Sequence, residues 1–331
     1  MVIDYSRIKR ILIIRLSSIG DILLTSPLVR SIKKKYPAIE IDYLLREEFN
    51  ELVQNNPYIE VIHNYRREKS ENHSLINSLQ SNNYDLVIDL QNNFRSREIV
   101  KKLKCPILKF KKNNLKKFLL VHFKINMLKY ADKIPERYAA AAQIRLDEEG
   151  LEYFISQSPD SRLKENESYI GLCYGAKHFT KRWPLEFFID LGKRLESAGY
   201  KVILFGGMDE AKSAEEISRH LTNAINLCGN NLSQTAANLK ICKAVYTNDS
   251  GLMHLAAAMR VPVIAFFGST VKEFGFYPYK AKSIELEIKD LSCRPCTHTG
   301  RANCPKGHFK CLKDIKPELA FQSLKNFLAV Q

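Results

Sequence analysis

The sequence lacks any long apolar stretch. None of its 331 residues belong to a run that approaches the roughly 18 apolar residues of a membrane-spanning helix. Residues 1–10 also lack the apolar centre of a secretory signal peptide. These absences argue against an integral membrane protein and a secreted one, and 45% hydrophobic with 26% charged residues is typical of a soluble globular chain. We therefore expect a cytoplasmic protein.

Two common nucleotide-binding motifs are missing as well. No G-x-x-x-x-G-K-[ST] sequence is present, which argues against P-loop phosphoryl transfer. No G-x-G-x-x-G follows an expected strand, which weakens the case for a dehydrogenase. Without a signal peptide, eight cysteines do not indicate a disulfide scaffold. Four of them lie in or near apolar runs, where a small buried thiol is common: Cys105, Cys173, Cys228 and Cys242.

Positive charge is in excess, with 51 basic residues against 36 acidic ones and a formal net charge of +15. Both halves of the chain share this excess, so we expect no dedicated basic domain and no nucleic-acid partner. The strongest concentration is residues 101–124, with nine lysines, no acid and interleaved apolar residues. This pattern is typical of an amphipathic basic surface that rests on anionic lipid head groups. A solvated lysine-rich face explains it equally well.

Residues 244–269 predict a compact unit of strand, polar turn, short helix and second strand. The turn supplies helix-capping residues, and the helix is expected to begin at Ser250 or Gly251. Its free backbone N–H groups and positive dipole end make the turn a natural seat for a phosphate, because Gly251 has no side chain to block close approach. His254 lies one turn into the helix. A well-capped surface helix is the simpler interpretation of the same pattern.

The rest of the chain alternates between buried strands and amphipathic helices, which predicts an α/β fold with parallel sheets. Residues 155–167 are polar and poor in apolar side chains, so we place a linker there between domains 1–155 and 156–331. In the first half, the buried strand around Ile11 leads into a polar turn with Asp21, which the helix dipole alone would explain. Residues after a neighbouring strand are expected at the same sheet edge: Asp89, Gln91, Asn92 and Arg95.

In the second half, the loops that follow strands carry residues suited to phosphate and ribose. Small residues allow close backbone approach, cations offset a diphosphate, and a carboxylate accepts hydrogen bonds from ribose hydroxyls. These residues are Gly175 and Ala176, Lys181 and Arg182, Gly206, Gly207 and Asp209, and Ser250 with Gly251. Together they predict a pocket for an anionic nucleotide.

Four stretches of the sequence resemble the ADP-heptose:lipopolysaccharide heptosyltransferases of glycosyltransferase family 9. They are RLSSIGDILLTSPLVRSIKKKYP, KRWP, LFGGMDE and NDSGLMHLAAAMRVPVIAFFGST, and their order and spacing extend over nearly the whole chain. The resemblance implies a GT-B fold of two facing Rossmann-like domains with an interdomain cleft, in which the first binds the acceptor and the second the nucleotide-sugar. The C-terminal helix is a candidate to pack back on the first domain. The implied reaction moves a heptose from ADP-heptose to the lipopolysaccharide inner core with inversion and without a catalytic metal or another cofactor.

The resemblance also implies roles for single residues. Asp21 matches the general base that takes a proton from the acceptor hydroxyl. Lys181 resembles the lysine that holds the donor phosphate, and Asp209 stands where the family has an acid directed at the nucleotide. The D-[TS]-G-x-x-H element around the donor corresponds to Asp249, Ser250, Gly251, Leu252 and His254. Because the implied acceptor is an anionic, lipid-anchored saccharide at the cytoplasmic leaflet, the lysine run would draw the enzyme to the inner membrane.

A second cysteine group stands near the C-terminus in the pattern C-x2-C-x7-C-x6-C, with His298 and His308 nearby. Its members are Cys293, Cys296, Cys304 and Cys311. A structural zinc site, a redox-sensitive thiol group and a plain cysteine-rich loop all fit these spacings.

Two further functions remain as alternatives at this stage. A family 9 transferase that uses another nucleotide-sugar would share every motif. A basic membrane- or RNA-binding Rossmann protein without catalysis would explain the charge, but it has no need of Asp21.

Overall fold

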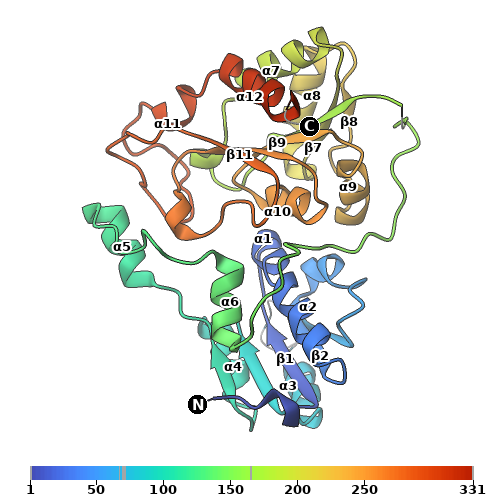
Figure 1. The fold of residues 1–331 in the computed structure, drawn as a ribbon, viewed down its shortest axis with the longest axis vertical. Helices are drawn as coiled ribbons and strands as arrows, with labels where there is room; N and C mark the ends of the chain where they lie inside the picture. Colours follow the sequence, from blue (N-terminus) through green and yellow to red (C-terminus); the bar gives the residue numbers. More distant parts are fainter. Residues whose placement is uncertain (1, 67, 69–71, 165, 330–331) are drawn as a thin grey trace. The chain divides into compact units, whose positions relative to one another are not determined.

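The computed structural model describes residues 2–66, 68, 72–164 and 166–329, and it divides into two compact units (Figure 1). The first unit comprises Met1–Asn113 and Asp132–Phe154, and the second comprises Asn114–Ala131 and Ile155–Gln331. Each unit is built on its own sheet, and every strand pairing described is parallel. The predicted α/β fold with two parallel sheets is therefore confirmed. Within the part of the chain that the structure describes, no helix is both long and apolar enough to cross a bilayer.

The first unit has a five-stranded sheet in the order β3-β2-β1-β4-β5. Its central strand β1 (Arg10–Ile14) is buried at Ile11–Ile14, as expected for a strand covered on both faces. The other strands are β2 (Glu40–Arg46), β3 (Val61–Tyr65), β4 (Leu86–Asp89) and β5 (Ile107–Lys109). Its helices are α1 (Ile19–Leu23), α2 (Ser26–Lys35), α3 (His73–Ser81), α4 (Phe94–Val100) and α6 (Ile134–Ala142), with short 3-10 turns η1 (Tyr5–Arg7) and η2 (Glu47–Leu52).

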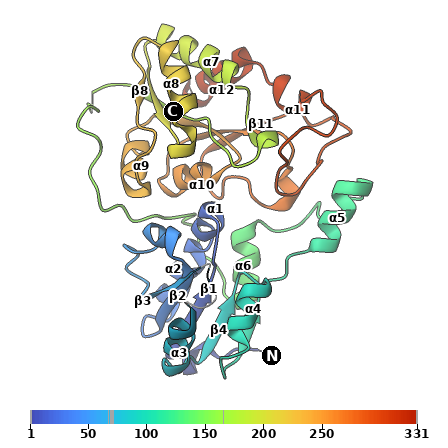
Figure 2. The same ribbon diagram turned by 180° about the vertical axis from the view of Figure 1, so that it is seen from behind.

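The second unit has a six-stranded sheet in the order β11-β10-β9-β6-β7-β8. In its core, the rings of Trp183 and Phe266 stack with their centroids 4.2 Å apart. The strands are β6 (Tyr169–Cys173), β7 (Lys201–Phe205), β8 (Ile225–Asn226), β9 (Ala244–Asn248), β10 (Val263–Phe267) and β11 (Ser283–Glu287). The helices are α5 (Asn114–Phe123), α7 (Leu185–Ser197), α8 (Ala211–Arg219), α9 (Leu232–Leu239), α10 (Gly251–Ala258), α11 (Lys310–Lys313) and α12 (Pro317–Ala329), with 3-10 turns η4 (Phe179–Lys181), η5 (Met208–Glu210) and η6 (Lys272–Phe274). Figure 2 shows the same elements from behind.

The C-terminal helix α12 packs within the second unit, where it contacts α7, β10 and β11. Its buried residues Ala320, Leu324 and Phe327 join the core of that unit. Tyr246 also donates a hydrogen bond to the Ala320 carbonyl over 2.8 Å. Apolar burial thus holds the helix on the unit that immediately precedes it in sequence.

Residues 114–131 belong to the second unit, although both flanking segments belong to the first. Leu120, Val121 and Leu128 pack there against Phe274. The lysine run 101–124 is therefore divided between the two units. Its first part forms β5 in the sheet of the first unit, and its second part forms α5 of the second unit.

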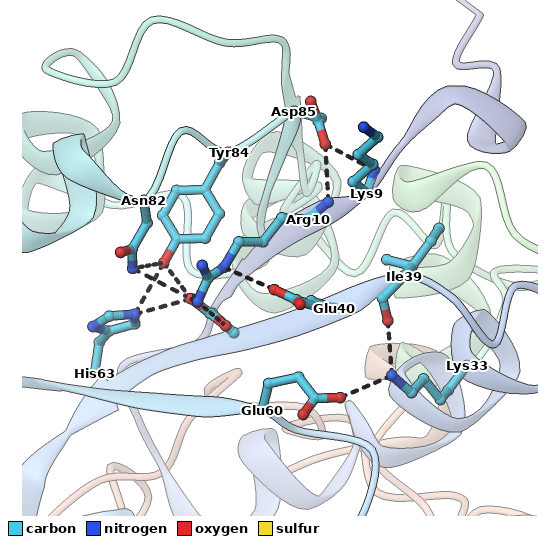
Figure 3. A network of polar contacts seen from close by, with 11 residues as sticks. Lys9, Arg10, Lys33, Ile39, Glu40, Glu60, His63, Asn82, Tyr84 and Asp85 are labelled. Atoms are coloured by element: carbon cyan, nitrogen blue, oxygen red, sulfur yellow. Dashed lines mark hydrogen bonds and ion pairs between the residues drawn. The ribbon is translucent and has the colours of Figure 1, made fainter.

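A polar network joins the amino ends of the strands in the first unit (Figure 3). Asp42 on β2 is fully buried and accepts a hydrogen bond from Tyr84 over 2.6 Å. His63 Nε2 and Arg10 Nη2 lie 3.2 and 3.0 Å from the same carboxylate oxygen. Burial raises the pKa of Asp42, but the hydrogen bonds from His63 and Tyr84 and the charge of Arg10 outweigh it and leave the pKa below its ordinary value. A buried carboxylate is thus satisfied at the sheet edge opposite Asp21.

Candidate functional site

In the first unit, Asp21 lies in α1 just after the central strand β1. Its Oδ2 accepts hydrogen bonds from the backbone N–H and the hydroxyl of Ser18, over 3.3 and 3.0 Å. Its Oδ1 lies 2.7 Å from Arg15 Nη2. The Arg15 side chain is 9% exposed and the Asp21 side chain 21%. The cation is therefore the buried member of this pair, and the carboxylate is the accessible one.

Arg15 is held rigidly behind Asp21. Its guanidinium donates to the carbonyls of Ser17 and Leu90, each over 2.9 Å. Its guanidinium carbon lies 5.7 Å from the centre of the Tyr138 ring, a cation–π distance. Because three other groups fix the guanidinium, it positions the Asp21 carboxylate at the carboxyl end of β1.

The residues expected beside Asp21 have mainly structural roles. Gln91 Oε1 accepts hydrogen bonds from the N–H groups of Leu16 and Ser17, so it does lie against the turn that leads to Asp21. Asp89 is fully buried and accepts from the backbone N–H groups of Gln91 and Asn92. Its burial raises its pKa and outweighs these hydrogen bonds. Arg95 is exposed.

Lys112 lies near the Asp21 turn, which the sequence interpretation did not foresee. It is half-buried, and burial together with the charge of Arg15 lowers its pKa, while Asp89 and Asp21 act in the opposite direction. The side chain is thus close enough to Asp21 to interact with it electrostatically. The sequence places this lysine only within the basic run, and no signal in that run distinguishes it from its neighbours.

In the second unit, α10 starts as expected, with Ser250 as its N-cap and Gly251 as its first residue. Asp249, just before this helix, lies 2.7 Å from Lys181 Nζ and accepts a 2.7 Å hydrogen bond from Thr270. Burial raises the pKa of Asp249, but Lys181, Thr270 and the nearby His254 outweigh it and hold the pKa below its ordinary value. The Asp249 side chain is 6% exposed and that of Lys181 17%. Here the carboxylate is buried and the cation accessible.

The cysteine-containing loop near the C-terminus supports the turn that carries Lys181. Thr180 donates its backbone N–H to the Arg301 carbonyl over 3.1 Å, and Arg301 returns a 2.9 Å bond to the Thr180 hydroxyl. Phe179 stacks on Phe309 with ring centroids 4.8 Å apart. These contacts hold η4, and with it Lys181, beside the N-terminus of α10.

Glu210, the neighbour of the expected residue Asp209, contributes contacts to the glycine-rich loops. Glu210 Oε2 accepts the backbone N–H of Gly207 over 2.7 Å. A Cβ at Gly175 would lie 2.6 Å from the Glu210 carboxyl carbon, so a larger residue there would displace this carboxylate. Asp209 itself is exposed. The signal for Glu210 was its spacing of three residues from Gly207, which is the spacing of a capping box.

Other expected donor residues take part in the same cluster of loops. Arg182 Nε donates to the Ala176 carbonyl over 2.6 Å, which joins the loop after β6 to the turn of Lys181. The hydroxyls of Ser250 and Ser269 are buried, and neither has a hydrogen-bond partner among the residues that the structure describes. His254 is buried and Leu252 is half-buried. Buried hydroxyls are normally satisfied, so these two are available to an oxygen-rich ligand at the N-terminus of α10.

The family model of glycosyltransferase family 9 (heptosyltransferase) matches residues 72–306, which is more than half of the chain. The chain belongs to glycosyltransferase family 9. Among curated relatives, it is 28% identical to lipopolysaccharide heptosyltransferase 2 of Salmonella typhimurium, with 97% of this chain and 99% of the relative covered. It is 29% identical to lipooligosaccharide heptosyltransferase 2 of Haemophilus influenzae, with 96% and 99% covered.

Solved structures agree with the fold expected for a family 9 enzyme. The family 9 glycosyltransferase of Veillonella parvula superposes with a TM-score of 0.81 at 24% identity, covering 100% of this chain and 99% of that one. The ADP-heptose heptosyltransferase II of E. coli gives a TM-score of 0.73 at 24% identity, covering 97% and 98%. The predicted GT-B type of fold is confirmed, and with the family match the chain is identified as a glycosyltransferase.

Cys293, Cys296, Cys304 and Cys311 are free cysteines, and the first three are half-buried while Cys311 is buried. No group of three or more His, Cys, Asp or Glu side chains within the described ranges is arranged to hold a metal ion. Cys293 Sγ lies 3.8 Å from His308 Nε2. Burial raises the pKa of Cys311 to about 12 and also raises that of Cys296, so their reactive thiolate forms are scarce near neutral pH.

Proposed function

We propose that the enzyme transfers a heptose from ADP-heptose to the inner core of a lipid-linked lipopolysaccharide acceptor, with inversion at the sugar carbon. The observation that carries this proposal is the pair of opposite ion pairs at the strand ends. One presents a carboxylate, as a base requires, and the other presents an ammonium group beside a helix N-terminus, as a leaving diphosphate requires. Relatives named heptosyltransferase, which align over nearly the full chain, support the choice of sugar.

Asp21 is the proposed general base. It takes the proton of an acceptor hydroxyl as that oxygen forms a bond to the anomeric carbon of heptose, while the bond from that carbon to the diphosphate oxygen breaks. One displacement of this kind inverts the configuration. The accessible Asp21 carboxylate suits this role because buried Arg15 fixes its position without covering it.

The second unit is proposed to bind the donor. Lys181 and the free N–H groups at the start of α10 offset the charge that develops on the departing diphosphate, which is the task that a metal ion performs in other transferases. The unpartnered hydroxyls of Ser250 and Ser269 are suited to phosphate or ribose oxygens. Arg182 and Glu210 hold the surrounding loops in place.

The first unit is correspondingly proposed to bind the acceptor. A lipid-anchored acceptor requires the enzyme to act at the surface of the inner membrane, on its cytoplasmic side. The excess of positive charge supports a peripheral association with that anionic surface.

A donor-competition assay tests the proposal. The purified enzyme is given ADP-, GDP- and UDP-linked heptose with a soluble inner-core acceptor, and products are identified by mass spectrometry and by the NMR signal of the new anomeric proton. We expect a product that contains one added heptose, an ADP donor consumed at least about tenfold faster than the others, and an inverted anomeric centre. Equal use of all three donors would refute the ADP assignment, and a retained configuration would refute the role of Asp21 as a base.

A further inference from the structure

The segment of residues 114–131, here called the α5 segment, is fixed to the second unit on one side. Leu120, Val121 and Leu128 are buried against Phe274 of η6. The Lys124 ammonium donates to the carbonyls of Cys293 and Pro295, over 3.2 and 2.7 Å. Asn126 donates to Glu273 over 3.1 Å. These contacts place the segment firmly, so the orientation of its other side is determined.

That other side is apolar and exposed. Leu115, Phe118 and Phe123 have exposed fractions of 71, 51 and 62%, and Ile125, Met127 and Tyr130 in the following loop are also exposed. Leu115, Phe118 and His122 are three or four residues apart and share one face of α5, opposite the buried residues Leu120 and Val121. A helix on a soluble surface normally presents polar residues outward. This helix presents aromatic ones, with Phe118 within 4.5 Å of the His122 ring centre and 5.9 Å of that of Phe123.

The charge of the α5 segment is of one sign. It contains four lysines and no acidic residue. Lys124 has the structural role described above, and Lys117 lies over the Phe276 ring at 6.0 Å. Lys116 and Lys129 are exposed beside the apolar side chains. Apolar side chains interleaved with lysines and free of acids are the composition that binds an anionic lipid surface.

We propose that the α5 segment docks the second unit on an anionic bilayer. Leu115, Phe118 and Phe123 enter the boundary between head groups and acyl chains, and Lys116 and Lys129 lie at the level of the lipid phosphates. The inference deepens the proposed function and rests on it for the presence of a lipid-anchored acceptor. It assigns docking to a part of the chain that packs on the proposed donor-binding unit, rather than to the whole lysine run.

Vesicle co-sedimentation of the full-length protein tests the apolar contribution. With vesicles of phosphatidylcholine and phosphatidylglycerol, the double substitution Phe118→Ser with Phe123→Ser should weaken binding on the order of tenfold to a hundredfold. Phe118→Trp should keep binding, because it preserves the apolar character. The matched control is Leu319→Ser on α12, which removes a side chain that is also 51% exposed. Equal sedimentation of parent and double variant would overturn the proposal.

The Phe118→Trp variant also measures how deeply the side chain at position 118 enters the bilayer. The only native tryptophan, Trp183, is buried in the core, so brominated lipids should quench the fluorescence of the Phe118→Trp variant and leave that of the parent unchanged. If the variant binds vesicles and its fluorescence is not quenched, the side chain at this position stays outside the bilayer, and the proposed insertion is refuted.

Charge variants test the choice of an anionic surface. Lys116→Gln with Lys129→Gln should lower affinity for phosphatidylglycerol vesicles by on the order of tenfold, with little change for pure phosphatidylcholine. Binding of the parent should fall as salt is raised. The exposed pair Lys193→Gln with Lys212→Gln, on α7 and α8, is the control for net charge. An equal loss in the control pair would assign the effect to overall charge and overturn the role of the α5 segment.

Two further measurements separate this inference from its competitors. Transfer to a soluble, lipid-free acceptor should be unchanged in the α5 variants. Loss of vesicle binding with that activity intact supports the inference, whereas a parent that binds vesicles through α5 but transfers no heptose would contradict the proposed function alone.

Light scattering without vesicles gives the mass of parent and double variant, and a parent dimer that the serine substitutions dissociate would show that this face binds a second copy instead.

Discussion

Two ion pairs, at the turns after β1 and β9, contain the same chemical groups with opposite burial. Each turn follows a central strand of its sheet and leads into a helix, and its carboxylate lies 2.7 Å from a cation, which for Asp249 is Lys181 of η4. After β1, the cation Arg15 is buried and Asp21 is the more exposed partner. After β9, Asp249 is buried and Lys181 is the more exposed partner. The solvent-exposed partner is thus negative in the first pair and positive in the second.

This difference indicates which group each turn offers to a ligand. A buried, hydrogen-bonded ion holds its partner in place, and the accessible partner is left to react or bind. The β1 turn therefore offers a base, and the ion pair at the β9 turn offers the Lys181 cation of η4 next to the positive end of α10. Substitutions at each member of each pair test this assignment.

Asp21→Asn should have the largest effect. The amide keeps the shape of the side chain but cannot accept the proton, so kcat should fall on the order of a thousandfold. Affinity for ADP, measured by calorimetry, should stay within a few-fold of the parent. Asp190→Asn, which removes an exposed carboxylate from α7, is the control and should leave both unchanged. Loss of ADP binding in parallel with activity would assign Asp21 to the fold or to the donor.

Lys181→Ala should give the opposite pattern. It removes a charge-assisted contact to phosphate worth about 1.5–3 kcal/mol, so affinity for ADP should weaken roughly ten- to a hundredfold. The control is Lys177→Ala, an exposed lysine in the same loop. Calorimetric titration with ADP measures both variants. An unchanged ADP affinity in Lys181→Ala would remove Lys181 from the donor site and leave its contact with Asp249 as a purely structural ion pair.

Sequence patterns were sufficient for the main elements of the fold. The apolar run at Ile11–Ile14, the glycine pair 206–207 and the capping residues before α10 each have a local physical signature, and the corresponding strands and helices are present. The packing positions of α5 and α12 cannot be predicted from local sequence. They depend on which apolar face finds a complementary surface, as Leu120 and Leu128 do at Phe274. The lysine run therefore suggested one surface where the chain in fact passes from one unit to the other.

The same limit applies to the candidate site. Asp21, Lys181 and Asp249 stand in recognisable motifs, and their partners Arg15 and Thr270 lie at the ends of the same stretches, but nothing in the sequence pairs them with these residues. The strand-and-turn pattern around Arg15 does not predict its burial. That burial results from contacts with Tyr138 and Leu90, which are distant in the sequence. Glu210, one position after Asp209, accepts the Gly207 N–H, and this contact depends on backbone geometry that the sequence does not show.

Arg15→Lys tests whether the buried cation positions Asp21. A lysine keeps the charge but cannot hold Ser17, Leu90 and Asp21 at once, because it lacks the planar fork of guanidinium. We expect kcat to fall by about tenfold with a smaller change in the KM for acceptor. The control is Arg7→Lys, in an exposed arginine–aspartate pair with Asp4. A purely structural role would lower thermal stability in Arg15→Lys without changing kcat of the folded enzyme.

The smallest expected effect is a pH-dependent difference in stability between the parent and Asp249→Asn. The folded-state pKa of Asp249 lies below its ordinary value of 3.8, because Lys181, Thr270 and His254 outweigh the effect of burial. A carboxyl group whose pKa is lowered by folding stabilises the protein above its unfolded pKa, and this contribution disappears as pH falls through the folded value. Chemical denaturation should therefore show the parent more stable by about 1–3 kcal/mol above roughly pH 5, with the difference shrinking as pH is lowered through 3.8. Asp190→Asn should show little difference at any pH. A difference between parent and Asp249→Asn that grows at low pH would mean that Asp249 is protonated in the folded state, and Lys181 would then lack the buried counter-ion that distinguishes its turn from that of Asp21.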